Sequence, residues 1–523
     1  MTRDVDIAIV GSGFSGSLLA MIARRLGRSV LLLERGHHPR FAIGESSTPL
    51  AALLLEEIAG RYDLPRLLPL AKYGSWRRAY PDVACGLKRG FSFFRHEAGA
   101  PFAADRAHRD QLLVAASPHD AIGDVHWYRP DLDFFLVREA VASGAAYLDG
   151  VTITGVEPHA DGARLFGDHL EVRARLVVDA TGPRGCLHRH LAHGERALPG
   201  LPPTQTLFNH FTGVRRFAEV APRAFDGTPP YAPDDAAVHH VFDGGWILVL
   251  RFDNGITSAG IAATEPLARE LRLGEGAPAW SRLMARFPSI GAQFAAAAPT
   301  RPFTWWPRLA FYSDTIAGAG WVSLPSAAGI VDPLLSTGFP LTLLGVQRVA
   351  AAIAETWDTP QLPERLRAYA ARTAGELETT ARLVGALYDA FGDWERFTAL
   401  TFLYFAAASF TESARRLGRA ALAGDAFLLG AHEPFAAALH RSLRLAAELR
   451  ERPSAARRRR VLEAIASAIA PVNVAGLGDP TRGNWYPASA SDLLTAAGTL
   501  GASVADVRAM LERCGFLPDG TGP

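Results

Sequence analysis

The stretch DVDIAIVGSGFSGSLLAMIARRLGRSVLLLERG near the N-terminus constrains the fold of this chain more than any other feature. Residues 7–10 are apolar and rich in β-branched side chains, as in a strand buried on both faces of a parallel sheet. Gly11, Gly13 and Gly16 then form the pattern GxGxxG, and the apolar residues that follow recur at helical spacing. The stretch therefore predicts a strand, a tight turn, a helix and a second strand, SVLLLE.

The three glycines have distinct roles in a turn of this kind. Gly11 permits the tight turn, Gly13 lets the backbone approach a pyrophosphate, and Gly16 lets the helix pack closely on the strand. The positive end of the helix then meets the phosphate charge. Glu34 ends the second strand, where a carboxylate accepts a hydrogen bond from a ribose hydroxyl, and the adjacent Arg35 is assigned to the same dinucleotide site. An ordinary glycine-rich turn is the alternative, but all four elements stand in the register that a dinucleotide fold requires.

A second segment, ARLVVDATGPRG at residues 174–185, bears on which dinucleotide binds. A β-branched strand there runs into Asp179, Ala180, Thr181 and Gly182, and the segment resembles the DATG segment of glutathione-reductase-type flavoproteins. Taken alone, it is an ordinary transition from strand to turn. Together with the N-terminal motif it favours FAD, with Asp179 and Gly182 in the cofactor site.

Composition narrows the classes of ligand and partner. Among 523 residues, 54 Lys and Arg nearly balance 53 Asp and Glu, so no overall field attracts nucleic acid or an anionic membrane. The three cysteines are far apart in sequence, and no cluster of His, Cys or carboxylates has the spacing of metal ligands. The sequence has neither a signal-peptide pattern nor an apolar run of membrane-spanning length. We therefore expect a cytoplasmic enzyme that acts on a small molecule, without a metal.

The pattern along the chain predicts an α/β protein of three parts. A Rossmann-like FAD-binding domain of the glutathione-reductase type spans residues 1–200 and is completed by residues 310–350. A β-rich, substrate-facing module spans residues 200–310, and its clearest pair of strands is joined by Asn254–Gly255, a dipeptide suited to a hairpin turn. Residues 350–523 are rich in Ala, Leu, Arg and Glu and predict a C-terminal helical region.

One lysine stands directly before a phenylalanine-rich run, in GLKRGFSFFRH at residues 86–96. An ammonium beside aromatic walls is desolvated, which lowers its pKa, so Lys88 can either donate a hydrogen bond to an oxidant or react with it as an amine. The alternative is a solvated charge, because Lys88 followed by Arg89 is also typical of an exposed turn. These residues by themselves leave both interpretations open.

Together, GxGxxG, GESSTP, LKRGFSF and VDPLLSTG give the chain a resemblance to the flavin-dependent halogenases, a branch of the FAD monooxygenase superfamily. In that family reduced FAD reacts with oxygen to give a flavin hydroperoxide, which chloride or bromide attacks. The resulting hypohalous acid travels through a tunnel to a lysine beside the substrate. The family lysine lies in a K-x-x-x-x-F segment, which the residues from Lys88 to Phe93 match, so the resemblance implies that Lys88 is catalytic.

The resemblance also implies cofactor contacts outside the glycine turn. IGESSTP is similar to the family's GE-x-x-x-P strap, which places Gly44 and Ser46 beside the flavin ring. A helix N-cap by Ser47 or Thr48 explains part of this segment, and both uses can coexist. Arg129, in HWYRPDLDFF, is expected near FAD by the same resemblance.

The segment DPLLSTG is similar to the family segment whose backbone holds the halide near the flavin. The resemblance places the halide at Ser336, Thr337 and Gly338. Consecutive backbone N–H groups at the entry of a helix form an anion-binding concavity, so the residue types suit this role. A capped helix start without an ion is the alternative.

Two departures from the family bear on the reaction. The family motif WxWxIP would fall near GGWILVLRF, where Trp246 is present but the later positions differ. That motif is thought to discourage ordinary monooxygenation, so an FAD-dependent hydroxylase on the same scaffold is the alternative function. Leu335 stands where tryptophan-type halogenases have a glutamate that pairs with the lysine. A phenol- or pyrrole-like substrate is therefore expected in place of free indole.

The sequence thus predicts a halogenase that uses FADH2 and halogenates an electron-rich small molecule through hypohalous acid held by Lys88. The substrate is expected either free or bound to a carrier protein. A separate flavin reductase is expected to supply the reduced cofactor, because the sequence has one dinucleotide fingerprint and no second one for a nicotinamide. A flavin-binding protein without turnover is a further alternative, which the intact motifs oppose.

Overall fold

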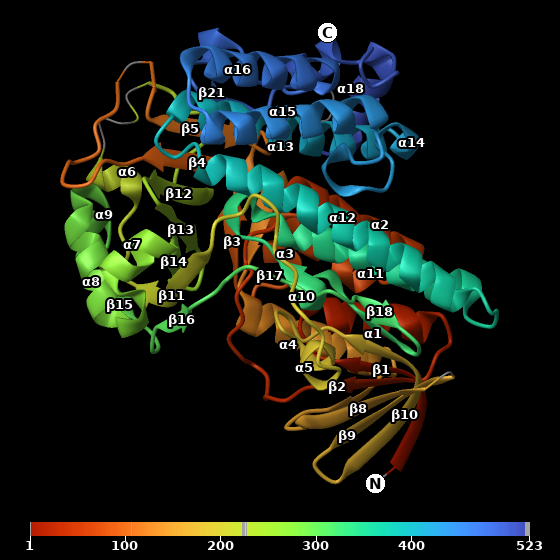
Figure 1. The fold of residues 1–523 in the computed structure, drawn as a ribbon. Coiled ribbons are helices and arrows are strands. Elements are labelled where there is room, and N and C mark those ends of the chain that lie inside the picture. The colour runs from red at the N-terminus through yellow and green to blue at the C-terminus, as the bar shows by residue number, and fades with distance from the viewer. Residues whose placement is uncertain (1, 106, 160, 222–224, 226, 518–523) are drawn as a thin grey trace.

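The computed structural model describes residues 2–517, except residues 106, 160, 222–224 and 226 (Figure 1). In the view of Figure 1 a first sheet lies at the bottom near the N-terminus, a second sheet lies at the left with its own helices, and the C-terminal helices lie at the top. Helices α11 (Gly338–Thr356) and α12 (Leu362–Tyr388) run between the first sheet and the C-terminal helices.

The first sheet contains the strands of the predicted dinucleotide fold. From edge to edge they are β18 (Ala317–Gly318), β19 (Trp321–Ser323), β10 (Leu170–Asp179), β1 (Thr2–Val10), β2 (Val30–Leu33) and β7 (Ala146–Leu148), with β9 (Gly162–Gly167) and β8 (Ile153–His159) attached antiparallel to β10. Strand β1 pairs in parallel with β10 and β2, and α1 (Phe14–Arg25) connects β1 to β2. The predicted strand, turn, helix and strand are confirmed.

Both faces of β1 are buried, which explains its unbroken apolar run. Ile7 and Ile9 belong to the main core with α1, whereas Ala8 and Val10 belong to a smaller core with residues of β8 and β9. The C-terminal end of β1 therefore leads into the glycine turn from a strand that packing holds on both sides.

The second sheet separates two cores. Its strands are β15 (Ala298–Pro299), β11 (Thr204–Thr212), β14 (Thr257–Thr264), β13 (Gly245–Arg251), β12 (Ala237–Phe242), β4 (Gly90–Arg95), β5 (Gln111–Ala115) and β21 (Trp485–Tyr486), with β16 (Thr304–Trp306) beside β11. Phe91, Phe93 and Trp246 belong to the core shared with the first sheet and the long helices. Phe94 and Ile247 belong to a separate outer core. Side chains thus alternate between the two faces along each strand.

The second sheet takes strands from three parts of the chain. Strands β11 to β16 come from the predicted module at residues 200–310, but β4 and β5 come from the N-terminal part and β21 from the C-terminal region. The pairing of β4 with β12 is parallel, which requires a long connection between them. The domain boundaries at residues 200, 310 and 350 stay a prediction. The second sheet itself takes strands from all three predicted parts.

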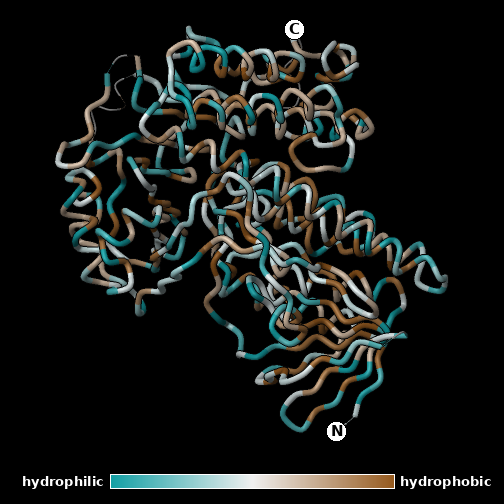
Figure 2. The backbone as a smooth tube through the Cα atoms, in the orientation of Figure 1, coloured by the Kyte–Doolittle hydropathy of each residue, from teal (hydrophilic) through white to brown (hydrophobic). Residues whose placement is uncertain are grey.

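Helices cover the outer face of the second sheet and form the C-terminal region. The outer helices are α6 (Phe217–Val220), α7 (Glu265–Leu271), α8 (Ala277–Arg286) and α9 (Pro288–Gln293). The C-terminal helices are α13 (Trp394–Arg416), α14 (Ala420–Ala423), α15 (Glu433–Glu451), α16 (Ala455–Ile469), α17 (Ala490–Thr495) and α18 (Val504–Arg513). Along the long helices hydrophobic and hydrophilic residues alternate, as expected for helices with one buried face (Figure 2).

A two-stranded ribbon lies where these parts meet. It consists of β3 (Cys85–Lys88) and β6 (Asp124–Trp127), which pair antiparallel. Helix α3 (Tyr73–Ala79) contacts β3, and further elements are α2 (Pro49–Arg61), α4 (Arg129–Ala142), α5 (Cys186–His190), α10 (Pro325–Ala328) and the pair β17 (Phe311–Tyr312) and β20 (Gly329–Ile330). The ribbon therefore places the end of β3 between the first sheet, the second sheet and the helices.

Among the described residues, the stretch Leu334–Thr356 alone is long and apolar enough to cross a membrane by length and composition. Of its most apolar window, 72% is buried inside the protein. Helices α1, α2 and α12 pack against α11, which forms most of this stretch. Its apolar character is accounted for by its position in the core.

Candidate active site

The glycine turn forms a cradle that side chains cannot enter. Gly11 has φ of +100°, and a Cβ added there would lie 2.6 Å from the carbonyl oxygen of Ala180. A Cβ added at Gly16 would lie 2.0 Å from the carbonyl oxygen of Gly11. The first N–H groups of α1 have no acceptor within the helix and remain for an anion. Glycine is thus required at both positions, because other backbone atoms approach too closely for a Cβ. A pyrophosphate-binding turn has this property.

Two arginines bring positive charge to this cradle. A Cβ added at Gly13 would lie 3.3 Å from Nη2 of Arg129 and 3.8 Å from Nη2 of Arg40. The guanidinium of Arg129 is buried and forms an ion pair with Asp133 at 2.7 Å. The helix N-terminus favours a phosphate at this position, and the two guanidinium groups, each paired with a carboxylate, lie beside it.

Glu34 lies at the end of β2, as predicted, and its carboxylate is held in place. It accepts hydrogen bonds from Ser12, from the backbone of Gly36 and from Arg40 at 2.9 Å. Burial opposes ionisation of this group, but Arg40 and the hydrogen bonds outweigh it and lower the pKa of Glu34 to about 2. The carboxylate is therefore charged and oriented at neutral pH. Arg35, the neighbour predicted to share this site, is exposed.

The strap, defined here as residues 43–49, is tied to the cradle through Arg129. Nη1 of Arg129 donates hydrogen bonds to the carbonyl oxygens of Ile43 at 2.9 Å and Gly44 at 3.0 Å. Gly44 has φ of +85°, which favours glycine at this turn. Thr48 caps α2, since its hydroxyl accepts the N–H of Ala51. One arginine therefore contacts both predicted cofactor elements.

The DATG segment follows β10 as predicted, and its carboxylate stabilises its own loop. Asp179 is fully buried and accepts hydrogen bonds from the backbone of Thr181 at 2.9 Å and of Leu187 at 2.7 Å. Burial raises the pKa of Asp179, an effect that these hydrogen bonds oppose. Gly182 has φ of +84°, and an added Cβ would meet nothing within 4 Å. Asp179 thus fixes the turn against which Gly11 packs.

Lys88 is fully buried and lies between two loops that the sequence predicts for the active site. Its ammonium donates hydrogen bonds to the hydroxyl of Ser46 at 2.9 Å, to the carbonyl oxygen of Ser47 at 2.5 Å and to the hydroxyl of Ser336 at 3.4 Å. The hydroxyls of Ser46 and Ser336 are also hydrogen-bonded, at 3.0 Å. The lysine, the strap and the predicted halide segment thus meet at one point.

Aromatic side chains surround this ammonium. Nζ of Lys88 lies 3.8 Å from the ring centroid of Phe91. Burial lowers the pKa of Lys88 to about 7, and the carboxylate of Asp124 opposes part of this change. The wall continues through ring contacts among Phe91, Phe93, His239, Trp246, Tyr404 and Phe405. A charge enclosed in this way is titratable near neutral pH, as an acid or a nucleophile in a reaction requires.

The halide loop, defined here as residues 332–338, has an unusual backbone before α11. Leu335 and Ser336 both have positive φ, at 67° and 55°. The loop is held by Asp332, whose carboxylate accepts the N–H of Leu334 at 2.9 Å. Thr337 precedes α11, and a Cβ added at Gly338 would meet nothing within 4 Å. The start of α11 therefore faces open space with N–H groups that lack helical acceptors.

Comparison with known proteins identifies the family to which this chain belongs. Residues 9–49 match the family described as NAD(P)-binding Rossmann-like domain. The monodechloroaminopyrrolnitrin halogenase PrnC of Pseudomonas fluorescens is 30% identical over 411 residues, which cover 76% of this chain and 70% of that protein. The chain belongs to the flavin-dependent halogenases. The tetracycline 7-halogenase of Kitasatospora aureofaciens is 31% identical over 352 residues, which cover 65% of this chain and 61% of that protein.

The fold of this halogenase agrees with a solved relative. The crystal structure of the halogenase PltM in complex with phloroglucinol and FAD superposes with a TM-score of 0.80, at 24% identity, and the match covers 92% of this chain and 99% of PltM. The predicted fold class is confirmed. This halogenase is a flavin-dependent oxidoreductase, so its cofactor is FAD, used as FADH2, with chloride or bromide as the halide. The cradle formed by Gly11, Gly13 and Gly16, which added Cβ atoms would fill, fits the pyrophosphate of FAD.

The halide loop of this halogenase is anchored by a buried hydrogen-bond chain that sequence analysis did not find. The indole N–H of Trp246 donates to the hydroxyl of Tyr388 at 3.1 Å, and that hydroxyl donates to Asp332 at 2.8 Å. Burial raises the pKa of Asp332 to about 7, although the hydrogen bonds to its carboxylate act to lower it. Trp246 is the residue of the WxWxIP motif that this chain keeps. Through this hydrogen-bond chain it joins the second sheet to the halide loop.

We expect Tyr388→Phe to lower the free energy of unfolding by about 1–3 kcal/mol, because the substitution leaves the Trp246 N–H and one Asp332 oxygen without their partner in a buried site. Urea denaturation followed by tryptophan fluorescence measures the change. Tyr80→Phe is the matched control, since the Tyr80 hydroxyl donates to a carbonyl oxygen in an exposed position. Equal, small effects of the two substitutions would show that the buried chain does not stabilise the loop.

Two charged groups at the site were not expected from the sequence: Arg40, which pairs with Glu34, and Asp124, which lies buried opposite Lys88. Glu45, the glutamate of the GE-x-x-x-P strap, lies 2.9 Å from His210 of β11. One sequence signal bears on this region. Of the 54 basic residues, only Lys72 and Lys88 are lysines, and all others are arginines. Arginine does not deprotonate in proteins, so Lys72 and Lys88 are the two basic side chains of this chain that can supply a neutral amine.

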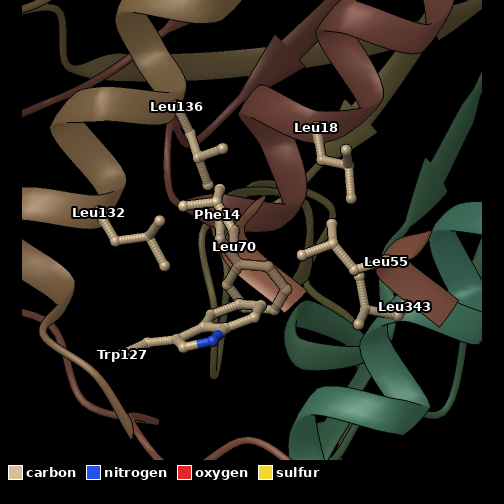
Figure 3. Close-up of a pocket in the computed structure, with 8 residues that line it drawn as sticks. All are labelled: Phe14, Leu18, Leu55, Leu70, Trp127, Leu132, Leu136 and Leu343. Atoms are coloured by element: carbon tan, nitrogen blue, oxygen red, sulfur yellow. The ribbon is translucent and has the colours of Figure 1, made fainter. Parts of the chain in front are cut away.

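A small cavity beside the cradle is too small for a substrate (Figure 3). Its volume is about 10 Å³, and apolar side chains of α1, α2, α4, α11 and neighbouring segments line it: Phe14, Leu18, Leu55, Leu70, Trp127, Leu132, Leu136 and Leu343. A space of this size holds about one water molecule, and an apolar lining leaves it dry. The cavity therefore belongs to the packing around α1.

Proposed function

We propose that this halogenase transfers halogen from hypohalous acid, held by Lys88, to an electron-rich small aromatic molecule of the phenol or pyrrole class. The observation that carries the proposal is the position of the Lys88 ammonium, which bonds to Ser46 of the strap and Ser336 of the halide loop. These loops resemble the family segments that flank the flavin and hold the halide. The ammonium therefore contacts both the strap and the halide loop, and it is proposed to bind the oxidant there.

The halide is proposed to bind at Ser336, Thr337 and Gly338. Open space at Gly338 and the free N–H groups at the start of α11 support an anion there. When bound, reduced FAD together with oxygen supplies the oxidising equivalent that converts halide to hypohalous acid. Arg129 and Gly44 hold the strap, and Glu34 is proposed to bind the ribose.

The halogen transfer balances without a further reactant. A carbon of the aromatic ring attacks the halogen of hypohalous acid, the bond between oxygen and halogen breaks, the carbon–halogen bond forms, and the ring proton leaves with the hydroxide as water. As an ammonium, Lys88 donates a hydrogen bond to the oxygen and makes the halogen more electrophilic. As an amine, Lys88 first takes the halogen with loss of water and then passes it to the ring carbon.

The substrate class follows from the aromatic wall and from the relatives. PrnC and the tetracycline 7-halogenase are named for aromatic substrates, and PltM was crystallised with phloroglucinol, a phenol. Aromatic side chains, among them Phe91 and Trp246, pack around the Lys88 region, and Leu335 leaves no carboxylate before Ser336. Other members of the family act on pyrrole attached to a peptidyl carrier protein, so both free and carrier-bound substrates enter the test. A separate flavin reductase is proposed as the source of FADH2.

The test is an assay of the purified chain with FAD, a flavin reductase, NADH and oxygen, with and without bromide. The substrates are a panel of free phenols, pyrroles and indoles and a pyrrole attached to a peptidyl carrier protein. Mass spectrometry is expected to find brominated phenol or pyrrole products that require bromide. Hydroxylated products that form with or without bromide would instead establish the monooxygenase alternative. Bromination of free indoles alone would contradict the substrate class.

A further inference from the structure

We propose that Asp124 is a positioning residue that holds Lys88 in its charged form from the opposite strand of the ribbon. The inference rests on the proposed function of Lys88. Tryptophan-type halogenases have a glutamate at the position of Leu335, and Asp124 would supply the carboxylate that is missing there. The inference assigns this task to β6, which lies outside the halide loop and the strap.

Strand register brings the two residues together. Lys88 and Asp124 are direct partners in the antiparallel pair of β3 and β6, so their side chains lie on the same face of the ribbon. Both are buried, with 0% and 2% of their surface exposed. Directly opposed residues in such a pair have Cβ atoms about 5 Å apart. An interaction between their charges in this environment is weakly screened.

The hydrogen bonds around the pair leave Asp124 available. The Lys88 ammonium bonds to the strap and the halide loop, and it forms no direct ion pair with Asp124 among the described residues. Oδ2 of Asp124 is buried and has no hydrogen-bond partner in the described part of the chain. A buried carboxylate oxygen without a partner is costly, so its retention opposite a buried cation calls for a role.

Other charged and titratable groups face the pair from several elements. On the Lys88 side these are His126 of β6 and His239 of β12, and on the Asp124 side they are Lys72, Tyr404, Glu412 and Arg416. Burial is the main cause that lowers the pKa of both histidines, and the positive charge of Lys88 lowers it further. Both histidines are therefore neutral at neutral pH. Asp124 is therefore the one negative group that acts on Lys88 among these neighbours.

The direction of the effect follows from charge. Burial lowers the pKa of Lys88 to about 7, and Asp124 raises it against burial. Burial in turn raises the pKa of Asp124 to about 7, which Lys72 and Lys88 oppose. Removing the carboxylate takes away the group that favours the ammonium, so Lys88 must lose its proton at lower pH.

The chain permits a direct measurement, because its two lysines give two side-chain signals. Lysine labelled with ¹³C at Cε is incorporated into the full chain loaded with oxidised FAD, and Lys72→Arg assigns the two signals by NMR. In the wild type the Lys88 signal is expected to titrate near pH 7. In Asp124→Asn its midpoint is expected to fall by about one pH unit or more.

Controls separate this effect from a general disturbance. Asp234→Asn changes another buried carboxyl, one that accepts N–H groups of α6 beyond the second sheet, and is expected to leave the Lys88 midpoint unchanged. Asp124→Ala repeats the test with a smaller side chain if the asparagine variant does not fold. A midpoint in both folded Asp124 variants that equals or exceeds the wild-type value would overturn the proposal.

The pH dependence of halogenation gives a second readout. Whichever form of Lys88 is active, the limb of the rate profile that Lys88 controls is expected to move to lower pH in Asp124→Asn, by the same interval as the NMR midpoint. A uniform loss of rate at every pH, with an unchanged midpoint, would mean a purely structural role. Absence of halogenated product from the wild type would refute the proposed function, whereas the NMR result tests Asp124 independently.

Discussion

Replacing Lys88 with methionine is expected to reduce the yield of halogenated product by at least about 100-fold, while the reoxidation of reduced flavin by oxygen continues at the wild-type rate. Methionine keeps the apolar length of the side chain and removes the ammonium that bonds to Ser46 and Ser336. Flavin reoxidation does not require this group, because the proposed role of Lys88 begins after the halide has been oxidised. Product analysis by mass spectrometry and stopped-flow absorbance of the flavin give the two rates.

Arg89→Met is the matched control for this substitution. Arg89 is the next residue in the chain, but its guanidinium pairs with Asp120 at 2.6 Å and with the carbonyl oxygen of Ser117, away from the strap and the halide loop. Its loss is expected to leave halogenation within a few-fold of the wild type. Circular dichroism establishes that both variants are folded. Halogenation by folded Lys88→Met at more than a tenth of the wild-type rate would refute the catalytic assignment.

The second large effect is expected at the cradle, where Gly16→Ala should abolish FAD retention and lower the free energy of unfolding by about 3 kcal/mol or more. The new Cβ would lie 2.0 Å from the carbonyl oxygen of Gly11 and 3.1 Å from Cβ of Ala180. These are the turn and the strand end that define the cradle, so α1 must move away from them. Flavin absorbance after gel filtration and thermal unfolding measure the two consequences.

Gly60→Ala provides the comparison for Gly16→Ala. Gly60 also lies in a helix, α2, but it is exposed and an added Cβ would meet nothing within 4 Å. Alanine favours the helix by up to about 1 kcal/mol over glycine, so this variant is expected to retain FAD and to unfold at an equal or higher temperature. If Gly16→Ala bound FAD as Gly60→Ala does, the close approach at the cradle would not govern cofactor binding.

Local patterns identified much of the fold and several site segments. The strand, turn and helix around Gly11 could be predicted because glycine spacing and apolar periodicity act within one short stretch. The helical character of residues 350–523 could be predicted for the same reason. The strap and the halide loop were recognised by their motifs, although the sequence did not show that Ser46 and Ser336 share one ammonium.

The pairing of distant segments was less accessible. Strands β4 and β5 were expected with the FAD-binding domain, yet they complete the second sheet through the parallel pairing of β4 with β12. The partners of Trp246, which are Tyr388 and through it Asp332, come from α12 and the halide loop. No periodicity within β13 carries information about these partners, because they are brought together by packing.

The sequence by itself predicted a dinucleotide cradle at the N-terminus, because the GxGxxG spacing stands between an apolar strand and a helical pattern. The structure adds the reason for the glycines, since the backbone at Gly11 and Gly16 leaves no room for a Cβ. The sequence also marked Lys88 as a candidate, but a lysine before aromatic residues fits an exposed turn equally well. Only the tertiary structure decided that Lys88 is buried and faces Asp124. Desolvation depends on what every surrounding element covers, and the opposition of two residues depends on the register of β3 against β6.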